Sequence, residues 1–172
     1  MLLRNIPFET ACVRIVSYTQ SPSLSPDEVL EFLNYMTVAR VCTHNKDGTI
    51  HVAPVWYYYE GGQLIFGTPY NSVKAKNIRR DNRVTVLVDD EGPPTRGVII
   101  YGEATLTEEN IEESALKVFN RRMSSQRAVD YRDGLFKLTK WVTVIVIPKK
   151  IASYDYVKDT RYRQATAFMS ND

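Results

Sequence analysis

The chain has 172 residues, of which 44% are hydrophobic and 24% are charged, and its formal net charge at pH 7 is +2. This composition is ordinary for one globular domain that is large enough to bury a core. The nearly balanced charge excludes a protein that coats nucleic acid by charge alone, because such proteins need a strongly basic domain.

The cysteine count and the hydropathy pattern bear on the compartment. Cys12 and Cys42 lie far apart without a CxxC spacing, which excludes a zinc ribbon and a disulfide framework and leaves two buried thiols in a reducing cytosol. Residues 1–6 have neither a cationic start nor an apolar core, and no apolar run reaches transmembrane length. We therefore expect a cytoplasmic protein that has no membrane and no nucleic acid as a partner.

The first third of the chain predicts one helix and then a change to strands. The pattern at 11–18 fits either an extra strand or a segment that covers a site. Ser25, Pro26 and Glu28 form the start of a helix, because serine caps, proline fits the first position and glutamate completes a capping box. Alternating runs bounded by Gly48 and by Gly61-Gly62 then predict strands over 39–45, 50–60 and 63–68.

The remainder of the chain predicts further strands and three helices. Apolar and β-branched runs predict strands over 83–89, 96–106 and 141–148, the last of which can continue over 149–156 after Pro148. Helices are expected over 72–81, 108–123 and, as a short one, 128–138. Several hairpins with few helices favour a mainly β fold, a small β-barrel with flanking helices. Neither GxGxxG nor GxxxxGK[ST] occurs, so there is no support for a Rossmann fold or a P-loop.

The stretch from Phe66 to Val84, "FGTPYNSVKAKNIRRDNRV", concentrates basic residues at a predicted helix start. Lys74 falls in the first helical turn, where the helix dipole places partial positive charge and disfavours a lysine. A bound anion would remove this conflict. Free N–H groups, the hydroxyls of Thr68 and Ser72 and the Lys74 ammonium together predict a phosphate site.

The order of these segments resembles the pyridoxamine 5'-phosphate oxidase-like family, the flavin-binding split barrels. The segments that carry the resemblance are "DGTIHVAPVWYYYEGGQLIFGTPYNSVKAKNIRRDNRVTVLV", "VIIYGEATL" and "IPKKIASYDY". The resemblance implies a six-stranded antiparallel Greek-key split barrel that forms a homodimer. It also implies a single domain over 1–172, with its core at about 24–156, an N-terminal extension at 1–23 and a short C-terminal tail.

The resemblance further implies an FMN cofactor in a groove at the dimer interface. Its phosphate would meet Gly67, Thr68, Ser72 and Lys74, with Lys76 as a helper. Its ring system would lie along one strand, and a tyrosine of the partner subunit, Tyr154 by its place in the pattern, would pack near the ring. The strand residues are Ala53, Pro54, Val55, Trp56 and Tyr57.

Departures from the family pattern imply a substrate other than vitamin B6. Val73 and Ala53 stand where the vitamin B6 oxidases carry arginines, and the Arg-x-His signature is absent near the C-terminus. The resemblance then implies a flavin-dependent oxidoreductase acting on a small organic molecule, without an assigned catalytic acid or base. The alternatives are a reductase that uses the deazaflavin coenzyme F-420, with Lys76, Arg79, Arg80 and Arg83 along its acidic tail, and a flavin carrier without turnover. His44 and His51 flank a turn, but two imidazoles are too few for a metal site.

Overall fold

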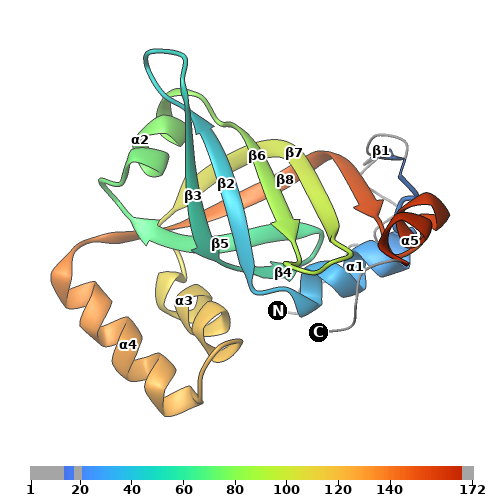
Figure 1. Cartoon of the computed structure of the whole chain (residues 1–172). Helices are drawn as coiled ribbons and strands as arrows, with labels where there is room; N and C mark the ends of the chain where they lie inside the picture. The colour runs from blue at the N-terminus through green and yellow to red at the C-terminus, as the bar shows by residue number, and fades with distance from the viewer. Residues whose placement is uncertain (1–13, 18–20, 168–172) are drawn as a thin grey trace.

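A curled antiparallel sheet with helices around it makes up the computed structural model, which describes residues 14–17 and 21–167 (Figure 1). The strands are β1 (Arg14–Ser17), β2 (Val38–His44), β3 (Ile50–Trp56), β4 (Tyr58–Glu60), β5 (Gln63–Pro69), β6 (Arg83–Asp89), β7 (Arg96–Thr107) and β8 (Trp141–Asp155). The helices are α1 (Pro26–Tyr35), α2 (Val73–Arg80), α3 (Ile111–Asn120), α4 (Ser125–Leu138) and α5 (Thr160–Thr166). The expected mainly β fold with flanking helices is confirmed.

The strand order is β3-β2-β6-β7-β8-β5-β4, and β1 pairs with β8 off this path. All neighbours on the path are antiparallel, whereas β1 runs parallel to β8. The prediction of six strands is therefore wrong. One expected strand over 50–60 divides at Tyr57, whose buried side chain turns into the core. The short β4 after that break pairs with β5, and β1 confirms that the segment 11–18 contains a strand.

The long strand β8 continues past Pro148, as the sequence predicted. Its register against β7 shifts between Tyr101 and Gly102, where a β-bulge interrupts the ladder. A side chain at Gly102 would place its Cβ 2.5 Å from the carbonyl oxygen of Ile147, which is far inside van der Waals contact. Glycine is therefore required for the close approach of the two strands at the bulge.

The main hydrophobic core lies inside the curl of the sheet and includes Leu33, Tyr57, Phe66 and Ile100. A second, smaller core joins the outer side of β5 to α3 and α4, and includes Tyr58, Ile65, Ala115, Val118, Phe119 and Ala128. Side chains alternate between the two cores along the tyrosine run, because successive side chains of a strand point to opposite faces. Tyr57 and Tyr59 enter the first core and Tyr58 the second.

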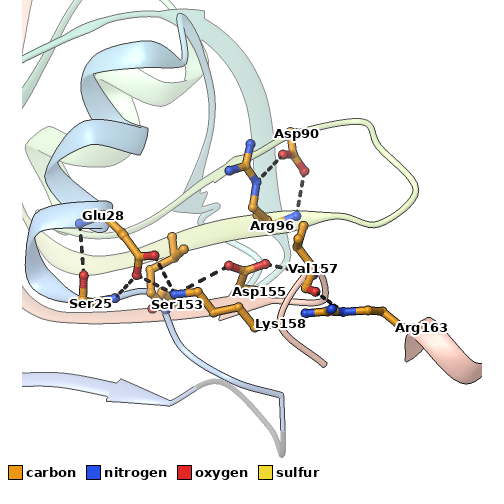
Figure 2. A network of polar contacts seen from close by, with 10 residues as sticks. Ser25, Glu28, Asp90, Arg96, Ser153, Asp155, Val157, Lys158 and Arg163 are labelled. Atoms are coloured by element: carbon orange, nitrogen blue, oxygen red, sulfur yellow. Dashed lines mark hydrogen bonds and ion pairs between the residues drawn. The ribbon is translucent and has the colours of Figure 1, made fainter. Parts of the chain in front are cut away.

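A polar network ties the start of α1 to the end of β8 (Figure 2). The backbone N–H of Ser25 donates to Glu28 at 2.7 Å, and the Ser25 hydroxyl accepts from the Glu28 N–H at 3.3 Å, so the predicted capping box is confirmed. Lys158 Nζ donates to both carboxylate oxygens of Glu28, at 2.7 and 2.6 Å. The N–H of Leu24 donates to the buried Ser153 hydroxyl at 3.0 Å. Among the described residues, no helix is long and apolar enough to cross a membrane.

Candidate functional site

The N-terminus of α2 carries the polar part of the site. Ser72 is the N-cap, and its hydroxyl accepts a hydrogen bond from the Ala75 N–H at 3.3 Å. The hydroxyl of Thr68, at the end of β5, lies 3.1 Å from the Ser72 hydroxyl. Thr68 is only 1% exposed, so the barrel fixes its position. Two hydroxyls thus meet at a helix end whose free N–H groups favour an anion.

Lys74 lies in the first turn of the same helix and is half-buried. Burial lowers the pKa of its ammonium, because desolvation disfavours the charged form. Within the part of the chain that the structure describes, Lys74 has no carboxylate and no hydrogen-bond acceptor as a partner. A desolvated ammonium without a partner, next to two hydroxyls and a helix N-terminus, would be stabilised by a bound anion.

A cavity of about 300 Å³ begins at this anion end and extends between the outer side of the sheet and the helices α3 and α4. Its lining residues on and near the sheet are Val38, Pro54, Val55, Trp56, Gly67, Thr68, Pro69, Lys74 and Trp141. Its lining residues on the two helices are Ile111, Ala115, Val118, Phe119, Tyr131, Leu135 and Phe136. Figure 1 shows α3 and α4 together beside β5, and residues of both helices form one side of the cavity lining.

Six of the eleven predicted site residues line this one cavity: Pro54, Val55, Trp56, Gly67, Thr68 and Lys74. The predicted ring strand and the predicted phosphate anchor are separated in sequence by a turn and a strand, and the fold brings them together. Ser72 touches the site through Thr68, while Ala53 is buried and Lys76 is exposed, both outside the lining.

Two predicted site residues lie away from the cavity of their own chain. Tyr57 is fully buried in the main core and donates from its hydroxyl to the Leu33 carbonyl at 2.8 Å. Tyr154 lies on β8 opposite Gly97, where a Cβ would stand 2.5 Å from the tyrosine ring. A role for Tyr154 at a cofactor therefore requires a second copy of the chain, and its placement there remains a prediction.

The other basic residues near α2 are engaged within the chain. Arg79 stacks over the Tyr70 ring at 3.8 Å and donates to the Tyr70 carbonyl at 2.9 Å. Arg80 donates to the His44 carbonyl and, at 3.1 Å, to Asn77 Oδ1. Arg83 binds both oxygens of Asp81, which holds the pKa of that carboxyl below its usual range. These guanidinium groups stabilise the fold around the anion end.

Sequence reasoning missed the aromatic wall. Phe119, Tyr131, Phe136 and Trp141 all line the cavity, but the sequence patterns of their segments indicated only helices and a strand. The available signal was the spacing on α4, where Tyr131, Leu135 and Phe136 recur at helical intervals on one side. Nothing local in the sequence shows that this side faces β3 and β5.

The two histidines do not form a site. The register places Ile50 opposite His44 and Thr43 opposite His51, so the two imidazoles leave the hairpin on opposite faces. No group of three or more histidine, cysteine, aspartate or glutamate side chains that could hold a metal occurs in the described ranges 14–17 and 21–167.

Comparison with known proteins assigns the family. Residues 25–141 match the family model described as pyridoxamine 5'-phosphate oxidase. The chain belongs to the pyridoxamine 5'-phosphate oxidase family. The match runs from the N-cap of α1 to the first residue of β8, and so includes Thr68, Ser72, Lys74 and both helices of the aromatic wall. None of the curated proteins matches the sequence.

Several solved structures share the fold of this chain. A conserved hypothetical protein from Mycobacterium tuberculosis is 26% identical with a TM-score of 0.71, over 82% of this chain and 90% of that one. An FAD-binding protein from Mesorhizobium loti is 22% identical with a TM-score of 0.56, over 77% and 93% of the two chains. A protein named F420 reductase is 20% identical with a TM-score of 0.55, over 70% and 93%. The last two likenesses, both below 25% identity, show a shared fold.

Proposed function

We propose that the protein is an FMN-binding oxidoreductase that passes hydride or electrons between the cofactor and a small organic substrate other than vitamin B6. The observation that carries the proposal is Lys74, a half-buried ammonium without a partner among the described residues. It stands beside the Thr68–Ser72 hydroxyl pair at the N-terminus of α2. This arrangement fits a terminal phosphate, because such a group accepts hydrogen bonds and offsets the buried charge.

The residues present fit the rest of the cofactor as well. The cavity leads from the anion end to Pro54, Val55 and Trp56 of β3, along which a ring system would lie. When bound, FMN supplies the redox chemistry. The chain's own residues bind the phosphate, orient the ring and exclude water with an apolar wall.

FMN is favoured over the deazaflavin coenzyme F-420 by the arginines. A cofactor with a long acidic tail needs an extended row of available cations beyond the phosphate site. Arg80 and Arg83 are bound to acceptors of the chain, and Arg79 is held by Tyr70. Among the cations near the start of α2 in the described residues, Lys74 alone lines the cavity, because the exposed Lys76 lies outside the lining. One cation at the cavity suits a single phosphate.

We also propose that the protein acts as a homodimer in the cytoplasm. In Figure 1, none of the helices in the described part of the chain covers the outer face of β2, β6, β7 and the first half of β3. It exposes Ile50 and Val52 on β3 and Tyr101 on β7, with half-buried Cys42 and Leu87 between them. A second copy would cover this apolar face and bring its Tyr154 within reach of the cofactor.

The test is flavin affinity in the double variant Ser72→Ala with Lys74→Ala. Charge-assisted hydrogen bonds contribute about 1.5–3 kcal/mol each, so the loss should reach about a hundredfold in Kd or more. Lys76→Ala is the matched control, because that lysine lies on the same helix and is exposed. The measurement is a titration of FMN, and in parallel of the deazaflavin, followed by absorbance and calorimetry.

The two titrations, with FMN and with the deazaflavin, together decide which cofactor the protein binds. Micromolar FMN binding that the double variant abolishes and Lys76→Ala preserves supports the phosphate site. Unchanged affinity in the double variant places the phosphate elsewhere and removes the proposal. Tight binding of the deazaflavin with no uptake of FMN reassigns the cofactor. A flavin that binds but is reduced and reoxidised no faster than free FMN indicates a carrier.

A further inference from the structure

We propose that the α3–α4 end of the cavity is the substrate site, and that it takes an uncharged, planar aromatic molecule carrying a carbonyl or similar acceptor oxygen. This inference rests on the proposed function in one respect only, the assignment of Lys74 to the cofactor phosphate. The name α3–α4 end is used here for the part lined by Trp56, Phe119, Tyr131, Leu135 and Phe136.

The charge of the lining sets the charge of the substrate. Lys74 is the one charged side chain among the lining residues that the structure describes. When it binds a phosphate, no side chain is left in the cavity to pair with a second anion, and none is present to pair with a cation. Burying an unpaired charge costs several kcal/mol, which disfavours charged substrates, including any with a phosphate of its own.

Arg122 lies close but does not supply a second charge. Its guanidinium stacks on the Trp56 ring at 4.8 Å and donates to the Thr37 hydroxyl at 2.5 Å. It is not part of the lining. Its effect is to hold the Trp56 indole in place from outside the cavity.

The rings of the α3–α4 end are arranged to accept another ring. The ring centroids of Phe119 and Tyr131 lie 5.0 Å apart in an edge-to-face arrangement. The ring centroid of Trp56 lies 6.1 Å from that of Phe119 and 6.0 Å from that of Tyr131. Phe136 stacks on Trp141 at 6.0 Å as a second aromatic pair of the same lining. Aromatic groups prefer such spacings, so a flat ligand gains specific ring contacts in addition to its apolar burial.

Two polar hydrogens of this end are available to an acceptor oxygen. Neither the Trp56 indole N–H nor the Tyr131 hydroxyl has a hydrogen-bond partner within the described part of the chain. The indole of Trp141, by contrast, already donates to the Leu135 carbonyl at 3.2 Å. The Tyr131 side chain is 42% exposed, so its hydroxyl is accessible to an incoming ligand. Donors without a partner beside an apolar lining favour a ligand oxygen that accepts from them, which points to an aromatic carbonyl compound rather than a plain hydrocarbon.

The chain provides its own reporter for this site, because its only two tryptophans, Trp56 and Trp141, both line the cavity. The probe is 2,3-dimethyl-1,4-naphthoquinone, a planar dicarbonyl whose blocked ring positions prevent addition of a thiol. We expect it to quench tryptophan fluorescence saturably in the cofactor-free protein. Absence of saturable quenching up to the solubility limit of the probe would overturn the proposal.

Variants on α4 test the place of binding. Tyr131→Ala should weaken the probe about tenfold, and Tyr131→Phe about threefold because it keeps the ring and loses the hydroxyl. Leu138→Ala on the same helix is the matched control, since that side chain is 80% exposed and does not line the cavity. Equal affinity in all four proteins, each checked for folding by circular dichroism, would contradict the assignment.

Equilibrium dialysis of the FMN-loaded protein separates this inference from the proposed function. Retained probe binding supports a substrate site next to the cofactor, whereas exclusion of the probe by FMN means that the cofactor ring fills this end. Naphthalene-2-sulfonate, a charged analogue, should bind the loaded protein at least tenfold more weakly, and equal binding would contradict the charge argument. If the protein takes up no FMN but still binds the probe, the cofactor proposal fails and the aromatic site stands.

Discussion

At the scale of the residue, Tyr57 shows how one side chain can anchor three segments. Its hydroxyl reaches the Leu33 carbonyl near the end of α1, and Arg121 from the end of α3 lies over its ring at 5.4 Å. Arg121 also donates to the carbonyls of Tyr57 and Met36, both at 2.9 Å. Burial raises the pKa of the Tyr57 hydroxyl, so it stays a neutral donor at all physiological pH values. Val55 on β3, which lies two residues before Tyr57, lines the cavity. Tyr57 therefore also fixes the strand that borders the site.

The variant Tyr57→Phe should lower the free energy of unfolding by about 1–3 kcal/mol, because it leaves the Leu33 carbonyl without its buried donor. Tyr59→Phe is the matched control. Tyr59 is also buried, with its pKa raised to about 12 by burial, but its hydroxyl has no hydrogen-bond partner among the described residues. Urea unfolding measures both variants. Equal losses for the two would show that the hydrogen bond to Leu33 is not what stabilises this region.

At the scale of the element, α1 is held to the sheet by its buried apolar side chains and by polar contacts of its first turn. The capping box orders the turn locally, and Lys158, far along the chain, binds the Glu28 carboxylate from the opposite end of the sequence. Hydrogen bonds from Lys158 and Ser25 lower the pKa of Glu28 to about 2, from an ordinary value of 4.5. The carboxyl is therefore charged in the folded protein at pH values at which it is protonated in the unfolded chain.

The consequence is a pH-dependent contribution to stability. Because the folded pKa of Glu28 is depressed, its contribution is complete above about pH 4.5 and is lost as the pH falls towards about 2. Glu28→Gln should destabilise the protein at pH 7 and flatten the loss of stability between those two values. Thermal unfolding of both proteins as a function of pH measures this difference. Other carboxyls with a lowered pKa, such as Asp81 and Asp159, contribute equally in both proteins, so their contributions cancel. Parallel pH profiles would refute the coupling.

At the scale of the whole molecule, the sheet has a covered and an uncovered part. Helices α3 and α4 cover the outer side near β5 and the end of β3, whereas the outer side of β2, β6, β7 and the first half of β3 carries apolar side chains that no helix of the described residues covers. Val52 on β3 is 54% exposed and lies opposite Cys42, in the middle of that face. A monomer would expose this apolar area to water, which a second copy would bury.

The variant Val52→Glu should convert a dimer into a monomer, because it places a charge in a dry interface without a partner. Val157→Glu is the control, since Val157 is similarly apolar, is 42% exposed and lies in the turn after β8. Sedimentation velocity measures the mass of each protein. A wild-type protein that sediments as a monomer at all concentrations, or a dimeric Val52→Glu protein, would contradict the proposal.

How much the sequence could predict differs between local and distant features. The capping box at Ser25, the start of α2 and the strand beyond Pro148 follow from short patterns, and the structure confirms them. The break at Tyr57 was not predictable, because it depends on Leu33 and Arg121, which are distant in sequence. The grouping of Thr68, Ser72 and Lys74 at the start of α2 was predictable, since the three lie within seven residues of one another. The aromatic wall was not, because its contact with β3 arises only when the sheet curls.

The central place of β8 has a consequence for biosynthesis. In the path of the sheet, β5 has only β4 and β8 as neighbours, so β8 alone links the hairpin β4–β5 to β7 and the strands beyond it. While the ribosome is still adding residues before Asp155, the nascent chain holds two separate sheet fragments, with β3 on one and β5 on the other. The two sides of the cavity are joined late, by pairings between residues far apart in sequence, and such pairings form slowly. Until then, the unpaired edges of β5 and β7 are the surfaces that a chaperone would have to protect from aggregation.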